Sequence, residues 1–575
     1  MHTNMKSAPE RGRLSATGAA IGCVGCAIIT ASSVYTALKM GALPWPTIFT
    51  SITALVLLRA CGRTSLNEAN ITQIIMSAGS MVAGGLAFTI PGAWMLGLAD
   101  QMSWPQMLAV ALAGTLLGLV CTALIRKKFV EESDLEYPIG TAAAETLMAS
   151  RAGGATGRRL FGSMAAAGLW CILRDVAGIV PAMLCGLSIP GVSFAIYNSP
   201  MLASVGFLVG GTAVAFWLAG GLVANLGIIA GGSNLGLWSI ADAQGIVSSL
   251  GMGLMMGSGL GVLVRDILPK ARSLWKTQRR KADDALPGCA GNNPCRNPQR
   301  TDARRQGHLD AEALALFAAT AALLACLGIG LNPLMCIALV GLTFVASVMS
   351  AQSVGQTGID PMEIFGLIVL LAIAALGESD QVRLFLIAGV VAVACGLAGD
   401  VMSDFKTGQI IGTSPRAMWA GQAIGALLGA VASVTVMALL LAAYGPEAFG
   451  PGKDFAATQA SVVATMVSGI PSTGSFVIGL AVGIALYCLG IPAMMLGLGV
   501  YLPLHMTLTA SLGALIKLVY DRIFLRRTPG SAQSGGENAL RHEENGTLIA
   551  SGVLGGESIV GVLIALASVA SAMLG

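Results

Sequence analysis

The sequence predicts an all-α polytopic membrane protein with about 14–16 transmembrane helices in two pseudo-repeated halves, some of them broken or re-entrant. Of the 575 residues, 55% are hydrophobic and only 11% are charged, whereas soluble domains carry about 25% charged residues. The mean hydropathy is +0.77, and apolar stretches recur along the whole length. The fold is therefore expected to lie within the bilayer, without a separate soluble catalytic domain.

Apolar spans of about 20 residues indicate the individual crossings. In the first half they lie near residues 15–38, 47–60, 70–98, 105–125, 160–187, 201–230 and 244–264. In the second half they lie near residues 311–329, 331–350, 362–377, 383–399, 416–443, 456–468, 474–490, 492–516 and 547–574. Several spans are short or interrupted by Gly and Pro, so the predicted number of crossings is a range.

Basic residues predict the topology. Lys6, Arg11 and Arg13 precede the first span, which lacks a signal-peptide cleavage pattern, so we expect a retained first helix and a cytoplasmic N-terminus. The polar segment 265–310 holds eleven Lys or Arg and five Asp. It predicts a basic cytoplasmic linker between an N-terminal transmembrane half (1–264) and a C-terminal transmembrane half (311–575).

Between residues 126 and 265, the number of predicted crossings conflicts with the expected sides of the membrane, a problem that we call the parity conflict. Four crossings return the chain to the cytoplasm at Arg126, but only three clear spans separate this point from the linker. A crossing at 136–150 would close the count, yet it would place Arg158 and Arg159 outside, against the positive-inside tendency. We therefore expect a re-entrant element in this region.

The two halves resemble each other weakly. Residues 32–52 (SSVYTALKMGALPWPTIFTSI) align with 347–368 (SVMSAQSVGQTGIDPMEIFGLI), and 137–141 align with 501–505. Repeats with interrupted helices at corresponding positions are typical of secondary transporters, which hold substrate near the midplane. GxxxG spacings, such as Gly421-x-x-x-Gly425-x-x-x-Gly429, predict close helix packing and imply no chemistry.

Cysteines are numerous, but their positions favour packing over chemistry. Ten of the twelve lie in or at the ends of apolar spans, and we interpret these as small buried thiols. Only four histidines are present, and a metal site would need His or carboxylate companions. The sequence therefore predicts no metal site and no cofactor.

Four charged residues cluster within 399–417: Asp400, Asp404, Lys406 and Arg416. A charge at bilayer depth costs about 2.5–3.5 kcal/mol on insertion scales, so such a cluster indicates a water-filled path, an ion or a substrate. Two carboxylates at i and i+4 repel each other unless a proton or cation intervenes. We predict proton coupling at Asp400 and Asp404, with Lys406 and Arg416 as counter-charges; the alternative is a cytoplasmic loop with a Thr-Ser-Pro-Arg turn.

Three further segments predict contacts with a substrate. Carboxamides at the start of the third span share one helical face, although they could instead form an N-cap among the headgroups. Residues 136–145 place Pro138 and Gly140 before an Ala-rich helix whose N-terminus could face an anionic ligand, or they form a plain loop-to-helix junction. The predicted substrate-binding residues are Asn67, Asn70, Gln73, Glu136, Tyr137, Thr141, Tyr501 and His505.

His505 is the best isolated candidate for a pH-responsive group, with a core histidine as the alternative. Other isolated polar residues could line a pathway, pair structurally or lie at an interface: Arg174, Asp175, Asp360, Glu363, Glu378 and Glu557.

Five segments carry a family resemblance: NEANITQIIMSAGSMVAGGLAF (67–88), EYPIGTAAAE (136–145), GDVMSDFKTGQIIGTSPRAMWAGQ (399–422), GVYLPLHMTLTASLGALIK (499–517) and LIASGVLGGESIVGVLIA (548–565). In this order they resemble the oligopeptide transporter (OPT) superfamily, and within it the Yellow Stripe-like branch and its prokaryotic relatives. The resemblance implies a many-helix secondary transporter that moves peptides, or metal–chelate complexes in the Yellow Stripe-like branch, with protons. The chain lacks the NPG-type and KIPPR-type motifs of the peptide-transporting eukaryotic branch, so the resemblance leaves the cargo open.

We therefore expect proton-coupled symport of oligopeptides across the bacterial inner membrane, with a siderophore-like or nicotianamine-like metal chelate as the alternative cargo. The expected partners are a small peptide or peptide-like chelate, protons and the lipid bilayer, but not nucleic acid; a homo-oligomer is left open. An enzyme is not expected, because no H-E-x-x-H or G-x-S-x-G motif occurs. A passive channel would differ by a flux that is insensitive to the proton gradient.

Overall fold

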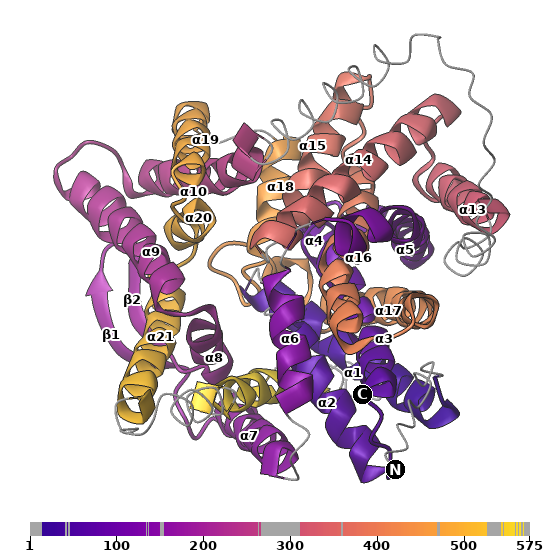
Figure 1. Cartoon of the computed structure of the whole chain (residues 1–575). Coiled ribbons are helices and arrows are strands. Elements are labelled where there is room, and N and C mark those ends of the chain that lie inside the picture. The colour runs from indigo at the N-terminus through magenta and orange to yellow at the C-terminus, as the bar shows by residue number, and fades with distance from the viewer. Residues whose placement is uncertain are drawn as a thin grey trace, which may run out of the picture.

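The computed structural model describes residues 14–40, 46–133, 137–149, 155–262, 311–357, 360–468, 472–525 and most of 542–567, together with Leu43, Leu135, Val264 and Arg265. Apart from one two-stranded sheet, the regular elements of these parts are helices, joined by turns and loops (Figure 1). Seven of the described helices are long and apolar enough to cross a membrane, and five shorter apolar helices accompany them. The predicted all-α polytopic membrane fold is confirmed. The predicted linker lies outside the described residues except for Arg265.

The described elements of the first half are α1 (Ala16–Met40), α2 (Pro46–Ala60), α3 (Leu66–Ala87), α4 (Pro91–Met95), η1 (Ala99–Gln101), α5 (Trp104–Arg126), η2 (Lys127–Glu131), α6 (Pro138–Ala149), α7 (Ala155–Cys171), η4 (Ile172–Val176), β1 (Met183–Ile189), β2 (Val192–Tyr197), α8 (Pro200–Val209), α9 (Gly211–Leu222), η5 (Val223–Gly232) and α10 (Ile240–Val262). Those of the second half are α13 (Ala311–Ile329), α14 (Pro333–Thr357), α15 (Met362–Ala375), α16 (Gln381–Ile411), α17 (Pro415–Tyr444), η7 (Pro446–Ala448), α18 (Thr458–Ser468), α19 (Thr473–Cys488), α20 (Ala493–Tyr501) and α21 (Leu504–Leu525). A further helix, the C-terminal helix, covers residues 545–557.

Helices α3 and α16 form the centre of the molecule. The apolar window of α3 is 100% buried and that of α16 is 94% buried. The two helices are antiparallel, because Ser77 meets Asp404 while Gly85, further along α3, meets Val393, earlier in α16. Helix α17 packs on α3, and α5 packs on α16. A helix that is apolar all round is stable only when neighbours cover it on every side, as they do here.

Close packing of α17 on α3 depends on glycine. Gly421, Gly425 and Gly429 lie along one face of α17, against Ile71, Ile75 and Gly79 of α3 in the same order, so the two helices are parallel. A methyl group at Gly425 would lie 2.1 Å from the carbonyl oxygen of Ile75. The small residues allow the two backbones to approach, as the GxxxG spacing predicted.

The first three helices form a unit of two long parallel helices with a short helix between them. Gly22 of α1 lies against Ile75 of α3, and further along both helices the hydroxyls of Ser33 and Ser80 are 2.7 Å apart. Helix α2 has only 15 residues, about 22 Å of helix. This is shorter than the hydrocarbon thickness of about 30 Å, so α2 does not span a bilayer by itself.

Helices α14, α15 and α16 repeat this arrangement. Ser350 of α14 donates a hydrogen bond to the Cys395 carbonyl of α16 (3.1 Å), and the short α15, with 14 residues, lies between the long helices in sequence. Because α3 and α16 are antiparallel, the two units have opposite orientations. The weak resemblance between residues 32–52 and 347–368 therefore corresponds to an inverted repeat, the form that many secondary transporters share.

Helix α6 resolves the parity conflict. Gly140 at its start packs on Ser403 of α16, and Leu147 near its end packs with Leu58 of α2 and Ala69 of α3. Those last residues lie at the end of the bundle where α5 terminates, so α6 returns to the side from which the chain entered. The predicted re-entrant element is α6, and α7 then starts with Arg158 and Arg159 on the same side as Arg126.

Two expectations were wrong. The predicted span 160–187 ends early, because α7 stops at Cys171 and residues 183–197 form an antiparallel hairpin, with Ile189 paired to Val192 around Pro190-Gly191. Not all cysteines in apolar spans are free thiols, because Cys326 and Cys336 form a disulfide between α13 and α14.

A second group of helices contains elements from both halves of the sequence. Helix α10 packs on α19 and α20, α9 on α20, and α8 on α21, and this group lies beside the α3–α16 bundle in Figure 1. The two predicted halves therefore intermix in space.

Candidate functional site

Three short helices begin beside α16, and each begins with or directly after a proline. Thr47 in the first turn of α2 faces the carboxyl group of Asp404, and Gly140 in the first turn of α6 contacts Ser403. Asp360, directly before α15, lies beside Gly399. Helix N-termini carry free N–H groups and a partial positive charge, which stabilise carboxylates. The breaks in the chain thus place three positive helix ends around the acidic segment of α16.

Asp404 is the centre of this arrangement. Its side chain is 1% exposed, and its Oδ2 accepts a hydrogen bond from Ser77 (2.5 Å), while Oδ1 has no partner. Gln73 faces the same carboxyl group, and the Gln73 amide oxygen accepts hydrogen bonds from Thr50 (3.0 Å) and Ser51 (3.4 Å) of α2. Asp404 lies about 11 Å before the end of α16.

Other carboxylates extend the acidic cluster. Asp360, Glu363 and Asp404 all lie within electrostatic range of Asp400. Glu363 is 3% exposed, and both carboxylate oxygens of Asp360 are buried without a hydrogen-bond partner. The sequence had marked Asp360 and Glu363 only as isolated polar residues, because the break at Pro361 does not reveal which helix it faces. We call Asp360, Glu363, Asp400 and Asp404 the acidic cluster.

The predicted counter-charges do not pair with the acidic cluster. Neither Asp400 nor Asp404 forms an ion pair within 4.0 Å in the described part of the chain. Lys406 is partly buried and Arg416 is exposed at the start of α17. A buried carboxylate without a fixed cation is costly to keep ionised. The arrangement therefore suits a proton or a mobile cation.

Asn67 and Asn70 hold the junction between α16 and α17. Asn70 donates to the Thr413 hydroxyl (3.3 Å), which in turn donates to Oδ1 of Asn67 (3.0 Å). Helix α16 ends at Gly412 in the left-handed conformation, and Pro415 starts α17. The Thr-Ser-Pro turn is thus real, but the acidic residues before it are helical. Oδ1 of Asn70 is buried without a partner.

Tyr137 enters α6 in a strained conformation. Its φ is 47°, unusual for a bulky residue, and its side chain is 0% exposed. The Tyr137 amide donates to the Gly355 carbonyl (3.1 Å) and its hydroxyl to the Ala351 carbonyl (3.3 Å), both on α14. The side chain of Thr141 is partly buried one turn into α6, and Glu136 lies outside the described residues. These contacts fix the start of the re-entrant helix against the inverted repeat.

Tyr501 and His505 lie elsewhere. Helices α20 and α21 pack with α8, α9, α10 and β2, and His505 stacks edge-on against Tyr197 of β2 with ring centroids 6.2 Å apart. The structure therefore brings together three of the four predicted segments, and places the fourth at a separate cavity.

A buried ion pair joins residues that the sequence marked only as isolated polar residues. Arg174 and Glu557 have side chains 1% and 3% exposed, with Nη1 and Oε1 2.8 Å apart. Arg174 also binds Asp175 at 2.6 Å. Glu557 accepts hydrogen bonds from the Ser199 hydroxyl (2.9 Å) and the Met201 amide (2.7 Å) at the start of α8. This network joins the C-terminal helix to η4, which follows α7, and to the start of α8.

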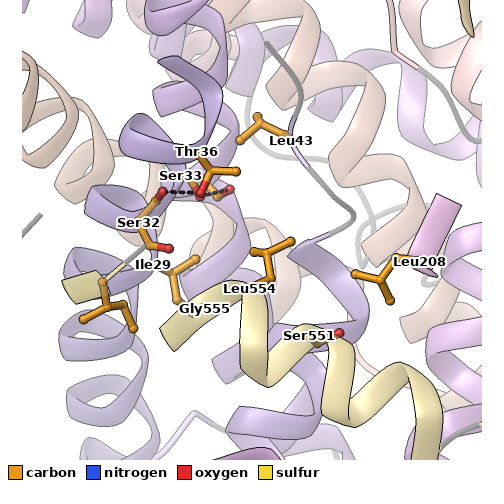
Figure 2. A pocket seen from close by; sticks show the side chains of 11 residues that line it. Ile29, Ser32, Ser33, Thr36, Leu43, Leu208, Ser551, Leu554 and Gly555 are labelled. Atoms are coloured by element: carbon orange, nitrogen blue, oxygen red, sulfur yellow. Dashed lines mark hydrogen bonds between the residues drawn. The ribbon is translucent and has the colours of Figure 1, made fainter. Parts of the chain in front are cut away.

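A small cavity lies between α1 and the C-terminal helix (Figure 2). Its volume is about 50 Å³, enough for a few water molecules and too small for a peptide. Its polar lining consists of hydroxyls: Ser32, Ser33, Thr36, Ser80 and Ser551. Ser80 follows Ser77 by one helical turn, so this hydroxyl cavity lies close to Asp404.

Comparison with known proteins decides the family. The profile of the OPT oligopeptide transporter protein family matches residues 14–568. The chain belongs to the OPT family. A Haemophilus influenzae protein named as a candidate oligopeptide transporter is 24% identical over 626 residues, covering 94% of this chain and 93% of that protein.

OPT relatives in plants match over a shorter segment. The metal-nicotianamine transporter YSL2 of Arabidopsis thaliana is 37% identical over 106 residues, 17% of this chain and 15% of its own length. The metal-nicotianamine transporter YSL2 of Oryza sativa subsp. japonica is 35% identical over 104 residues, 16% of this chain and 14% of its own length. The chain is thus a multi-pass OPT family transporter, similar over its length to a bacterial relative and locally to the plant proteins.

Proposed function

We propose that this OPT family transporter performs proton-coupled symport of small peptides into the bacterial cell across the inner membrane. The observation that carries the proposal is Asp404 of α16. It is a buried carboxylate without a counter-cation among the described residues, and α2 and α6 begin beside it. Protonation would remove the cost of the buried charge. Cargo bound near the broken helices would then affect proton binding at Asp404, because the starts of α2 and α6 would border both sites.

The predicted residues divide into two roles under this proposal. Asp400 and Asp404 would carry the coupling proton, with Lys406 and Arg416 moving toward them in another conformation. Gln73, Asn70 and Tyr137, together with Asn67, Glu136 and Thr141, would shape the cargo site around the helix breaks. Transport is the whole activity under this proposal; no catalytic step is assigned.

A metal chelate is the second candidate cargo. The local identity of 35–37% to metal-nicotianamine transporters favours it. The proposed metal would travel inside its chelate, so the protein would need contacts to the chelator and not ligands of its own.

The test uses the purified full-length protein in liposomes, with labelled trialanine and a labelled iron–nicotianamine complex as separate probes. An inward proton gradient should drive accumulation of one probe. Asp404→Asn, which mimics a permanently protonated side chain, should lower gradient-driven accumulation at least about 10-fold while retaining exchange of labelled for unlabelled cargo, because neutrality no longer requires a proton.

Asp100→Asn is the matched control, because Asp100 is exposed on η1 and far in sequence from the site. It should accumulate cargo like the wild-type protein. Gradient-driven uptake that survives unchanged in Asp404→Asn would remove this carboxylate from the coupling mechanism. Uptake of both probes that ignores the gradient would contradict symport.

A further inference from the structure

A cavity of about 370 Å³ lies at the end of α1, away from the acidic cluster. This volume is within the range of pockets that hold small molecules, about 300–1,000 Å³. Lys39, Tyr197 and His505 line its inner part and are each partly buried, whereas Glu447 and Asp454 on its rim are exposed. The exposed Lys453 also lines the rim, so the cavity has a lysine at depth and charges of both signs at its mouth.

Among the described residues, Lys39 has no polar partner. No hydrogen bond or ion pair joins its ammonium group to a described residue, and the nearest carboxylates, including Asp454, act on it only at longer range. The ammonium lies 5.3 Å from the ring centroid of Phe455. That ring is 1% exposed and stacks on Phe449, so it holds the lysine by a cation–π contact and leaves its three N–H donors unused.

The surrounding charges do not neutralise this lysine directly. The carboxylates of Glu557 and Asp175 are both bound to Arg174, whose guanidinium lies 5.3 Å from the Tyr197 ring. On the other wall, Nδ1 of His505 is buried without a hydrogen-bond partner. The partly buried Lys39 ammonium and the buried His505 Nδ1 thus line one cavity without a hydrogen-bond partner among the described residues, so both are available to a ligand there.

We propose that this cavity binds a carboxylate group of the cargo, with the Lys39 ammonium as its principal partner and His505 as a second polar contact. The proposal rests on the proposed function and adds the orientation of its substrate. A peptide C-terminus and an amino-carboxylate chelator share this chemistry. The exposed Glu447 and Asp454 would face an amino group of the same molecule.

The position of the cavity supports a role in cargo entry. Lys39 is six residues, about 9 Å along α1, from Ser33 in the hydroxyl cavity of Figure 2. Ser33 meets Ser80, and Ser77, one turn earlier in α3, binds Asp404. The carboxylate site, the hydroxyl cavity and the acidic cluster therefore follow one another along α1 and α3.

The test measures equilibrium binding to the purified full-length protein, so it does not depend on coupling. The probes are trialanine, trialanine amide and an iron–nicotianamine complex. Wild-type protein should bind trialanine at least about 10-fold more tightly than its amide, because the amide lacks the charge that a buried ammonium favours. This comparison needs no substitution and so no assumption about the folding of a variant.

Lys39→Met should weaken trialanine binding about 10-fold or more and bring the acid and the amide to equal affinity, and Lys39→Arg should restore part of the preference. Lys127→Met removes an exposed lysine in η2, which does not line this cavity, and should keep the preference. If iron–nicotianamine binds instead and loses affinity in Lys39→Met, the carboxylate belongs to a chelate.

Equal wild-type affinity for acid and amide, together with iron–nicotianamine binding that is unaffected by Lys39→Met, would overturn the carboxylate site. Failure of both probes to bind would do the same. Binding that depends on Lys39 without gradient-driven uptake would instead count against the symport mechanism and leave the site standing.

Discussion

Arg174 and Glu557 show what a buried charge needs in order to be stable. Their ion pair is supplemented by the Asn198 carbonyl, which accepts from Arg174 at 2.7 Å, and by the N-terminus of α8, which donates to Glu557. Burial of two ions is costly, and only such complete hydrogen bonding offsets it. Both carboxylate oxygens of Asp360 and Oδ1 of Asp404 are buried without a hydrogen-bond partner. For this physical reason we assign the Arg174–Glu557 pair to structure and propose that the acidic cluster acts in transport.

Arg174→Ala should destabilise the protein strongly, because Glu557 would remain buried and uncompensated. Losses of about 3–5 kcal/mol are typical for breaking a buried pair. The double variant Arg174→Ala/Glu557→Gln should be more stable than the sum of the two single changes indicates. Thermal unfolding in detergent measures this coupling as a double-mutant cycle.

Lys127→Ala provides the control for that cycle, since the Lys127–Glu132 pair is 62% and 56% exposed and exposed pairs contribute about 0–1 kcal/mol. Strict additivity of the Arg174 and Glu557 changes would contradict a direct energetic link between the C-terminal helix and η4.

At the residue level, the sequence points to a side chain where a local rule applies. Asp400 and Asp404 stand out because charge is rare in an apolar chain, and Tyr137 because Pro138 follows it. Asp360 and Lys39 could not be selected, because their importance depends on partners absent from their own segments. Sequence shows that a charge is present but not whether a distant carboxylate neutralises it.

At the scale of helices, the sequence predicted where helices are interrupted and where small residues allow close packing, but it did not predict the β-hairpin. Pro46, Pro138 and Pro361 mark the starts of the three short helices, as helix-boundary rules predict. The hairpin was missed because a hydropathy window merges its apolar strands with α7. The Pro190-Gly191 pair between two short apolar runs was the signal that could have revealed it.

Gly425→Ala should weaken the packing of α17 on α3. The added methyl group would lie 2.1 Å from the Ile75 carbonyl oxygen, so one helix must shift. Overpacking of this kind lowers the free energy of unfolding by about 1–3 kcal/mol. We expect a lower unfolding temperature and slower transport. The same substitution at Gly162 of α7, where nothing lies within 4 Å, should be neutral or stabilising by up to about 1 kcal/mol.

A Gly425→Ala protein as stable as the Gly162→Ala protein would mean that the α3–α17 contact is looser than its geometry indicates. The pair of variants separates the intrinsic helix preference of alanine from its effect on packing, because both glycines are helical.

At the scale of the whole molecule, helix directions sort the charges into two ends. The starts of α3 and α17 and the end of α5 lie together and carry Arg63, Arg416, Arg126, Lys127 and Lys128. We call this the basic end. The opposite end holds the Lys39 cavity, the hairpin and most of the exposed acidic residues named above. Positive charge marks the cytoplasmic side of membrane proteins, so the basic end is expected to be cytoplasmic.

The disulfide agrees with this orientation. The connection between α13 and α14 lies beside the start of α16, since Gly330 faces Arg383, so Cys326 and Cys336 lie at the end opposite the basic end. Disulfides persist in the periplasm and are rare in the cytosol. Charge and oxidation agree, so under the proposed function we expect the Lys39 cavity on the periplasmic side, where an importer would first meet its cargo.

Two free cysteines allow a direct test of this orientation. Cys61 follows α2 at the basic end, and Cys185 lies in β1 near the Lys39 cavity; both are exposed. In spheroplasts, a membrane-impermeant maleimide should label a variant that keeps Cys185 as its only free thiol, and should label the corresponding Cys61 variant only after permeabilisation. Labelling of Cys61 from outside with protection of Cys185 would reverse the orientation, and the Lys39 cavity would then be an exit site facing the cytoplasm.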